Sequence, residues 1–411
     1  MKENKHLHKD IKIGLTILLT LISAGVFYLL ITILPSKMRL YEENLPLNFQ
    51  LLAKDYIEKG QFKKAEKSFD DAEKAFKKDI VDKENLTKLY LFKSSYYQSR
   101  KEYEKAISSL KDLILLNAST MSLNSFFPEI YVRLAACYLS LNDFQNANLS
   151  FKIAYDLDNS LKTKIIGILS EQVKNTKGNR ELILETCDFL SYAGDYKDAL
   201  SILDKLRSTN PEKIRIMGEI YYKQKSYDKA ETYFEEHIQL VPDSLREYYY
   251  LENIYKILKE NNKISILNTN KRKIFKEINT YNTLSFSTGR PDKDSWTIKK
   301  EGYFERKFTL EEMKKGKLWL IAKGDLLMNL GPNFLLEIYD SKGSKLNPSE
   351  FEQIYINSTE FIPYEVDLND LIKKYNIKDQ ITLRFFYFNN TYSDYIFESR
   401  KPYVQSLYLK N

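Results

Sequence analysis

The sequence is poor in the residues on which most enzyme chemistry depends. Its 411 residues include three histidines, two cysteines and thirteen glycines. His6 and His8 lie on a short N-terminal tail, and His237 lies at a helix-packing position, so no histidine is placed as a catalytic base. So few glycines leave little room for a phosphate-cradling loop, and no dinucleotide fingerprint, GxSxG or HExxH motif occurs. We therefore expect a non-catalytic protein without a cofactor.

The two cysteines, Cys137 and Cys187, each lie inside a helical pattern among small or apolar neighbours. Such neighbours predict buried free thiols rather than a disulfide or a redox pair. There is no CxxC or zinc-ligand spacing, and the tail histidines have no further ligand nearby, so we expect no metal site.

Positive charge is in modest excess, with a formal net charge of +7. Residues 1–40 carry six basic and two acidic side chains, which leaves +3 for the other 371 residues. A charge spread so thinly predicts no nucleic-acid partner.

With 43% hydrophobic and 29% charged residues the chain is globular in composition, and its length predicts more than one folded unit. Frequent Lys, Asn, Ile and Tyr resemble proteins of AT-rich bacterial genomes.

One apolar segment is long enough to cross a membrane. Residues 13–34 read IGLTILLTLISAGVFYLLITIL without a charge. At about 1.5 Å per residue this stretch spans a hydrocarbon core of roughly 30 Å. The exit, Leu34-Pro35-Ser36-Lys37, lacks the small residues of a cleavage site, so we expect an uncleaved anchor. More basic residues precede the span, on the tail 1–12, than follow it. This bias predicts a single-pass protein of the bacterial inner (cytoplasmic) membrane with a cytoplasmic N-terminus and an extracytoplasmic bulk.

A grid of large and small residues recurs at helical spacing between residues 46 and 243. The fifth copy reads Ile214, Gly218, Tyr221, Tyr227, Ala230, Phe234 and Pro242. The second helix of each copy is predicted to start at an aromatic residue, namely Phe62, Tyr103, Phe144, Tyr196 and Tyr227. Only small side chains fit where two antiparallel helices cross closely, and aromatic rings fill the space beside the crossing. Each copy therefore predicts a helical hairpin.

This grid, with a proline closing the unit, resembles the tetratricopeptide repeat. The resemblance implies a helical solenoid, over residues 46–278, that binds peptides or other envelope proteins on a concave face. The copies are not evenly spaced by the roughly 34 residues typical of the family, which predicts an additional helix around Leu161–Lys174. Asp243–Glu260 is predicted to be a capping helix. Chaperone-binding members clamp a carboxylate with Lys and Asn, but the matching positions hold Gln50, Lys54, Leu91, Ser95, Val132 and Ala136. That activity is therefore not implied.

The helical pattern stops after Ile278, and residues 279–295 have the composition of a linker. Residues 296–411 alternate with period two and predict an eight-stranded, jelly-roll-like β-sandwich. The predicted strands are Trp296–Ile298, Tyr303–Phe308, Lys317–Lys323, Phe334–Tyr339, Glu352–Ile356, Phe361–Asp367, Ile381–Phe388 and Val404–Lys410. The segment Gly316–Gly343, with ITLRFFYFNN and the closing YVQSLYLK, resembles carbohydrate-binding β-sandwich modules. The last loop differs from theirs, so no calcium site is implied.

Alternation along three of these strands predicts which side chains face the core of the sandwich. Those of Leu318, Leu320, Ala322, Phe334, Leu336 and Ile338 would point inward. The opposite face would carry Trp319, Lys323, Glu337, Tyr339, Arg384 and Phe386. If the three strands share a sheet, aromatic rings and paired charges on that face suit a polysaccharide. The alternative is that this face packs on the solenoid.

Together these features predict a membrane-anchored, non-catalytic scaffold of the cell envelope. It would bind proteins through the repeats and a glycan through the sandwich, and a role in the export or modification of a surface polysaccharide would fit both parts. One alternative is an adaptor that binds only proteins, with the β domain packed on the repeats. A further alternative is a carbohydrate-active enzyme, whose two carboxylates need not be close in sequence.

Overall fold

The computed structural model describes residues 49–77, 83–118, 127–206, 209–278, 285–286, 290–292, 295–297, 303–324, 333–347, 352–356, 361–388 and 402–410. The chain divides into two compact units, here called the N-terminal unit (residues 1–93) and the C-terminal unit (residues 94–411). The predicted membrane segment, residues 13–34, lies outside the described residues. Within those ranges, no helix combines the length and the hydrophobicity needed to cross a bilayer.

The N-terminal unit contains the first predicted hairpin. Residues 49–58 are helical, α3 spans Phe62–Phe76, and α4, Lys83–Ser99, crosses the boundary between the units. Ala53, Ala65 and Phe69 are fully buried between these helices. The small and large residues of the grid therefore form the core of this hairpin.

The helical part of the C-terminal unit continues the same arrangement. Its helices are α5 (Tyr103–Ala118), α6 (Phe127–Ser140), α7 (Phe144–Leu157), α8 (Lys162–Asn175), α9 (Arg180–Tyr192), α10 (Tyr196–Lys205), α11 (Pro211–Lys223), α12 (Tyr227–Leu240), α13 (Leu245–Leu258) and α14 (Asn261–Ile274). The helices α3, α5, α7, α10 and α12 begin at the five predicted aromatic residues. The additional helix is α8, and α13 lies within the predicted capping segment.

The turns inside the hairpins share one backbone conformation. A residue with positive φ stands two positions before the next helix, namely Gly60, Lys101, Asn142, Gly194, Lys225 and Lys259. The following amide donates back into the preceding helix, as Ser226 N does to the carbonyl of Tyr221 at 2.9 Å. Bonds of this kind satisfy carbonyls that a helix end leaves open, so residues of different types build the same turn.

The helix crossings explain the small residues of the grid. A Cβ atom built on Gly218 of α11 would lie 2.7 Å from the ring of Phe234 on α12. Cys187 of α9 occupies the corresponding small-residue position and is fully buried. Cys137 and Cys187 are both free thiols, as predicted, and burial raises the pKa of each, that of Cys187 to about 12.

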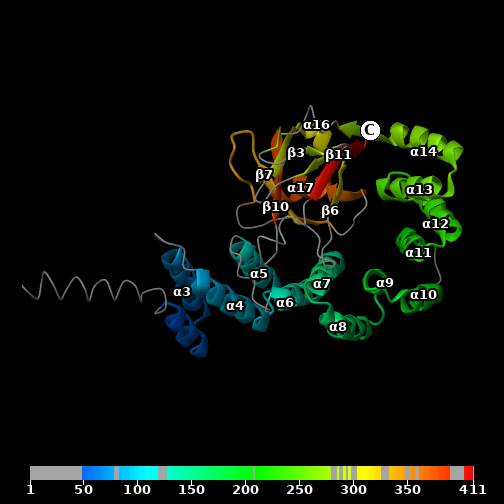
Figure 1. Cartoon of the computed structure of the whole chain (residues 1–411). Helices are drawn as coiled ribbons and strands as arrows, with labels where there is room; N and C mark the ends of the chain where they lie inside the picture. The colour runs from blue at the N-terminus through cyan, green and yellow to red at the C-terminus, as the bar shows by residue number, and fades with distance from the viewer. Residues whose placement is uncertain are drawn as a thin grey trace, which may run out of the picture. The chain divides into compact units, whose positions relative to one another are not determined.

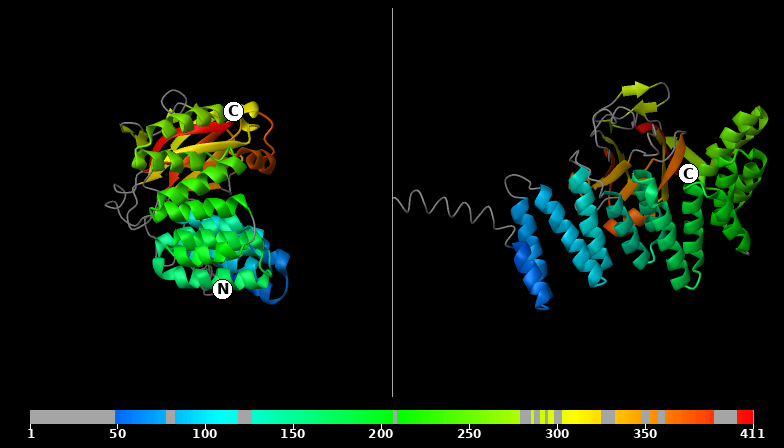
Figure 2. Two further views of the ribbon diagram at one scale, coloured as in Figure 1. Left: turned by 90° about the vertical axis from the view of Figure 1, so that its right-hand side faces the viewer. Right: turned by 60° about the horizontal axis from the view of Figure 1, so that its bottom comes forward.

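Insertion of α8 changes which helices form the inner layer. Both α7 and α8 pack against α9, and α11 packs against α9 in turn. Residues of α7, α9, α11 and α13 then line one shared cavity together with strands of the β domain. Figures 1 and 2 show the helices of the C-terminal unit following one another along an arc, with the strands on its inner side.

The β domain consists of two antiparallel sheets. Its strands are β1 (Phe275–Ile278), β2 (Ser285–Phe286), β3 (Arg290–Asp292), β4 (Ser295–Thr297), β5 (Tyr303–Phe308), β6 (Lys317–Gly324), β7 (Asn333–Tyr339), β8 (Glu352–Tyr355), β9 (Ile362–Asp367), β10 (Ile381–Phe388) and β11 (Pro402–Lys410). One sheet has the order β3-β4-β11-β6-β9, with β1 also paired to β11, and the other β2-β5-β10-β7-β8. From β4 to β11, consecutive strands lie in opposite sheets except β7 and β8, which is the connectivity of a double-sheet jelly roll.

Two sequence assignments differ from this arrangement. Phe275–Ile278, assigned to the helical domain, forms β1, and the predicted linker contains β2 and β3. Pairing with β11 explains the first difference, because Phe275 lies opposite Lys410 and Ile278 opposite Leu407. Short helices α16 (Leu310–Met313) and α17 (Leu368–Tyr375) also interrupt the strands.

The core of the sandwich contains the side chains that alternation predicts. Leu318, Leu320, Ala322, Phe334, Leu336 and Ile338 all belong to one buried cluster. Phe304 of β5 stacks on Phe385 of β10 with ring centres 4.5 Å apart. The outer face of the β6 sheet is buried as well, because Trp319, Ile321 and Tyr408 form a second cluster with residues of α13. The sandwich therefore packs on the helices through the outer face of the β6 sheet, with a further contact from Tyr355 of β8 to Asp156 of α7.

Candidate functional site

A cavity of about 700 Å³ lies between the inner helices and the sheet that contains β6 and β9. The helical wall consists of residues from α7, α9, α11, the end of α12 and α13, and the opposite wall of residues from β6, β8 and β9. We call this space the inner-face cavity. Its polar and charged lining residues are Gln145, Asn148, Lys152, Glu185, Asp188, Asn210, Glu212, Arg215, His237, Ser244, Arg246, Lys317, Tyr355, Tyr364 and Glu365.

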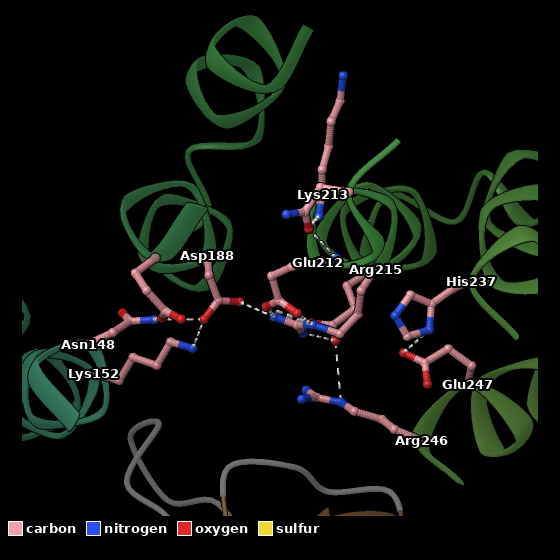
Figure 3. Close-up of polar contacts among 12 residues, drawn as sticks. Asn148, Lys152, Asp188, Glu212, Lys213, Arg215, His237, Arg246 and Glu247 are labelled. Atoms are coloured by element: carbon pink, nitrogen blue, oxygen red, sulfur yellow. Dashed lines mark hydrogen bonds and ion pairs between the residues drawn. The ribbon is translucent and has the colours of Figure 1, made fainter. Parts of the chain in front are cut away.

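Asp188 on α9 is the centre of one half of the helical wall (Figure 3). It forms ion pairs with Lys152 of α7 and, at 3.5 Å, with Arg215 of α11. The Asn148 amide donates to Asp188 at 2.8 Å and to Glu185 at 2.6 Å. Burial alone would raise the pKa of Asp188, but Lys152 and Arg215 outweigh it and hold this pKa well below its usual range. Burial and the charge of Asp188 raise the pKa of Glu185 to about 7.

Arg215 is the centre of the other half and, with Glu219, connects three helices (Figure 3). Its Nε donates to Glu212 at 3.0 Å and its Nη1 to Glu219 at 2.5 Å, one turn away on either side along α11. Glu219 also lies 3.3 Å from Nε of Arg246 on α13. Burial disfavours the charged guanidinium, but the surrounding carboxylates raise the pKa of Arg215 well above its ordinary value. Arg215 therefore stays charged and, with Glu219, links α9, α11 and α13.

His237 and Glu247 form a buried pair beside this network. Nδ1 of His237, at the end of α12, lies 3.4 Å from Oε1 of Glu247 on α13. The two residues are 4% and 0% exposed. Figure 3 shows the imidazole and the carboxylate facing one another across the two helices. This position agrees with the packing role that the sequence predicts for His237.

A carboxyl group joins the sandwich to the helices at one side of the cavity. Asp156 of α7 accepts hydrogen bonds from the hydroxyls of Tyr192 on α9 and Tyr355 on β8. Asp156 is 6% exposed. Burial raises the pKa of Asp156 to about 7, although the two hydroxyls and Lys152 act in the opposite direction. The protonation state of one buried carboxyl therefore affects the contact between α7 and β8.

The charges on the cavity wall are balanced. Each of its four cationic side chains is paired with a carboxylate: Lys152 with Asp188, Arg215 with Glu212, Arg246 with Glu219, and Lys317 with Glu365 at 3.0 Å. Where the structure describes the chain, no group of three or more His, Cys, Asp or Glu side chains could hold a metal ion. The wall is thus rich in hydrogen-bonding groups without a strong field of either sign.

The six residues predicted for a glycan site do not share one face. β6 belongs to one sheet, and β7 and β10 belong to the other. Trp319 is 1% exposed, lies edge-on to Phe275 at 5.1 Å between ring centres, and donates from Nε1 to Glu365 at 3.1 Å. Lys323 lies over the ring of Phe361 at 4.8 Å. These two residues are therefore on the sheet that packs on the helices.

The other four residues lie on β7 and β10 of the second sheet. Arg384 stands between Glu305 and Glu337 in the strand register and pairs with Glu305 at 2.8 Å. Its guanidinium stacks over Tyr303 and Tyr339 at 4.0 and 4.7 Å from the ring centres. The Tyr339 hydroxyl donates to Glu337 at 2.8 Å, and Phe386, on the same strand as Arg384, is half-buried. This outer face keeps the predicted mixture of aromatic rings and paired charges.

Sequence reasoning missed the network of the inner-face cavity. Its signal is the spacing Glu212, Arg215, Glu219, which places an arginine and its two acids on one side of a helix. Acidic side chains also stand next to the buried small-residue positions, with Asp188 after Cys187 and Glu219 after Gly218. Asp188 on α9 lies close to the side chains of α11 because these two helices pack against each other. The sequence did not show the cavity, since it does not tell that α7 and α8 both pack on α9.

Comparison with known proteins identifies one repeat. Residues 216–243 match the tetratricopeptide repeat family. This segment contains Gly218, Phe234 and His237, and it covers most of α11 and all of α12. No curated protein matches the sequence.

Solved structures of tetratricopeptide repeat proteins align with about half of the chain. A tetratricopeptide repeat protein from Parabacteroides merdae shares 14% identity over 56% of this chain and 78% of its own, with a TM-score of 0.25. The TPR2AB domain of yeast Sti1, in a complex with pHSP90, shares 16% identity over 56% of this chain and 92% of its own, with a TM-score of 0.27. The TPR domain of P58(IPK) shares 16% identity over 55% and 69%, with a TM-score of 0.25.

Proposed function

We propose that this chain is a membrane-anchored, non-catalytic scaffold of the bacterial cell envelope that binds partner proteins through its helical repeats. The repeated hairpins carry this proposal. They use one turn conformation and one large/small packing rule, and one of them matches the tetratricopeptide repeat family. Stacked hairpins of this kind offer an extended surface on which protein segments bind.

The packing of the sandwich favours a protein-binding adaptor over a glycan-binding role for the β6 face. Trp319 and Tyr408 of that face are buried against α13 and Phe275. The sandwich thus occupies the inner side of α7 to α13, where a partner segment would otherwise bind. We place the partner surface on the first hairpin, whose Leu51 and Leu52 are 58% and 43% exposed.

Photo-crosslinking in living cells tests this partner surface. A photoreactive amino acid replaces Leu51 or Leu52 in the full-length protein, and a matched control replaces Lys63, an exposed residue of α3 in the same hairpin. We expect a discrete crosslinked protein from Leu51 and Leu52 that is absent from the Lys63 control. Identical labelling from all three positions, or none from any, would contradict the proposal.

Cell fractionation tests the anchor. The full-length protein is expected in the membrane pellet after an alkaline wash, and a variant lacking residues 1–36 in the soluble fraction. If the truncated variant stays in the washed pellet, the segment 13–34 is not the anchor.

A second candidate, glycan binding, applies to the outer face of the other sheet. It is favoured by Arg384, which stacks over Tyr303 and Tyr339 between two glutamates. Aromatic faces stack on apolar sugar faces, and the charged groups pair with hydroxyls. Because the sandwich packs on the helices, the full-length chain is screened on a glycan array, with Tyr339→Ala as the variant. Signals that Tyr339→Ala leaves unchanged would count against this face.

A further inference from the structure

The inner-face cavity has the size of a small-molecule site. Its volume of about 700 Å³ lies within the range of roughly 300–1,000 Å³ that is usual for such sites. Its two walls come from different parts of the C-terminal unit, which the Tyr355–Asp156 hydrogen bond and the Lys410–Asp243 ion pair hold together. The space is therefore formed by the docking of the sandwich on the repeats.

The walls are held in place before any ligand arrives. Asp188 and Glu219 are 8% and 4% exposed and are fixed by ion pairs from neighbouring helices. Asn148, at 3% exposed, is oriented by donating to both Glu185 and Asp188. On the opposite wall Glu365 is fixed by Lys317 and by the Trp319 indole. Groups positioned in this way lose little freedom when they bind a ligand.

The pairing of charges selects the kind of ligand. An anion would have to compete with Asp188, Glu212, Glu219 and Glu365 for cations that these carboxylates already hold. A cation would have to compete with Lys152, Arg215, Arg246 and Lys317 for the carboxylates. If a charged ligand displaced one partner of such an ion pair, the other partner would be left as an unpaired charge on the cavity wall, which is costly. A neutral ligand avoids that cost.

The wall also distinguishes between neutral ligands. A hydroxyl group donates and accepts, so it can pair with a carboxylate, a guanidinium or the amides of Gln145 and Asn148. A peptide unit donates only through its N–H and accepts only through its carbonyl, so each of these groups can pair with only one sign of charge on the wall. Half-buried Tyr364 and buried Pro363 line the sheet side of the cavity. Aromatic and apolar faces of this kind pack on the ring faces of sugars.

We propose that the inner-face cavity binds a neutral, polyhydroxylated ligand of the sugar class, held by the paired charges of α7, α9 and α11 on one side and by β9 on the other. This site is separate from the outer face that carries Tyr339 and Arg384. It does not depend on the partner surface of the first hairpin. The sandwich thereby acts as the second wall of a binding site rather than only as a cap on the repeats.

Titration calorimetry on the full-length protein in detergent tests the proposal. The probes are three neutral disaccharides, maltose, cellobiose and N,N′-diacetylchitobiose, with glucuronic acid and glucosamine as charged counterparts. Gln145→Trp fills the cavity from an exposed position without a change of charge, and Glu212→Gln removes a charged acceptor. The controls are Glu171→Gln, at an exposed site of α8, and Tyr339→Ala on the outer face.

We expect at least one neutral disaccharide to bind, with affinity reduced about tenfold or more by Gln145→Trp and by Glu212→Gln, since a hydrogen bond to a charged group is lost or blocked. Glu171→Gln should leave the affinity within a factor of about two. Tyr339→Ala shows whether any bound sugar belongs to the outer face instead. If Glu212→Gln does not fold, Gln145→Trp alone decides the test.

Three results would overturn the proposal. One is the absence of binding by all three neutral disaccharides to a folded wild-type protein. A second is tighter binding of glucuronic acid or glucosamine than of any neutral probe. A third is binding that Gln145→Trp leaves unchanged and Tyr339→Ala abolishes, which would assign the sugar to the outer face of the sandwich.

Discussion

Three glycines of the helical region carry different constraints at the scale of single residues. Gly218 faces the Phe234 ring, where a Cβ would lie 2.7 Å from the nearest ring atom. Gly194 has nothing near its Cβ position, but its φ is +83°. Gly167 of α8 has neither constraint, because it is exposed and helical. The large/small grid of the sequence includes Gly194 and Gly218 but not Gly167, and it does not show that their constraints differ.

Replacement of these glycines by alanine is therefore expected to change stability in opposite directions. Gly218→Ala should destabilise the protein by about 1–3 kcal/mol, because the helix pair must move apart. Gly167→Ala should stabilise it by about 0.5–1 kcal/mol, since alanine restricts the unfolded chain in a conformation that suits the helix. Urea unfolding followed by circular dichroism measures both. Equal effects of the two substitutions would contradict this account of the crossing.

The buried carboxyl of Asp156 predicts a pH dependence. Its pKa is raised from an ordinary 3.8 to about 7, chiefly by burial. Between these values the folded protein binds a proton that the unfolded chain releases, so the free energy of unfolding falls as pH rises from about 4 to 7. We expect Asp156→Asn to flatten this part of the stability profile, measured as urea midpoints at pH 5 and pH 8.

The control for this substitution is Asp198→Asn, at an exposed position in the first turn of α10. It should retain the decline of the wild type between pH 5 and pH 8. If Asp156→Asn and Asp198→Asn behave alike, the decline does not come from the carboxyl that binds Tyr192 and Tyr355.

At the scale of elements, the two sheets of the sandwich have different outer faces. The β6 face packs on the helices through Trp319, whereas Tyr339 on β7 contacts its own neighbours Glu337 and Arg384. We expect Trp319→Ala to cost about 3–5 kcal/mol, the usual range for a buried tryptophan. Hydrogen exchange should become faster in β1 and α13, which lie against it.

The matched substitution is Tyr339→Ala, on the other sheet. It removes a cation–π contact worth about 1 kcal/mol and should leave exchange in β1 and α13 unchanged. Faster exchange at α13 in the Tyr339→Ala variant would mean that both faces contribute to docking on the helices.

The positions of the helices and strands were largely predictable from the sequence, whereas the pairing of the strands into sheets was not. The aromatic residues Phe62, Tyr103 and Phe144 marked helix starts. Phe144 fills space beside a crossing at 2% exposed, a local packing requirement, whereas Phe62 is 38% exposed. Period-two alternation identified the strands, since it reports which side of a strand is buried. It cannot report which sheet a strand joins, so Trp319 and Tyr339 were grouped although β6 and β7 lie in different sheets.

The same limit applies to β1. Phe275–Ile278 continues an apolar pattern from α14, and only its pairing with β11, more than 120 residues later, makes it a strand. The network of the inner-face cavity depends on contacts of the same long range, such as that of Asp156 with Tyr355. Local sequence signals do not contain such contacts.

At the scale of the whole molecule, the sandwich depends on the repeats for part of its burial. Trp319, Ile321 and Tyr408 are covered by α13 and its neighbours rather than by the second sheet. A fragment of residues 275–411 would expose this face, and we expect it to bind the dye ANS and to associate in solution. The full-length protein should show neither property. A monomeric fragment without dye binding would contradict this dependence.

The strand order also determines which part of the protein can fold first during synthesis. β11 is central in its sheet, between β6 on one side and β1 and β4 on the other, yet its residues, 402–410, follow those of all its neighbours in the chain. The repeats can fold as they leave the ribosome, because their contacts are local. The sheet that covers them cannot be finished until residues 402–410 have been made. We expect a newly made chain to pass through a stage in which the polar groups of α7, α9, α11 and α13 face water.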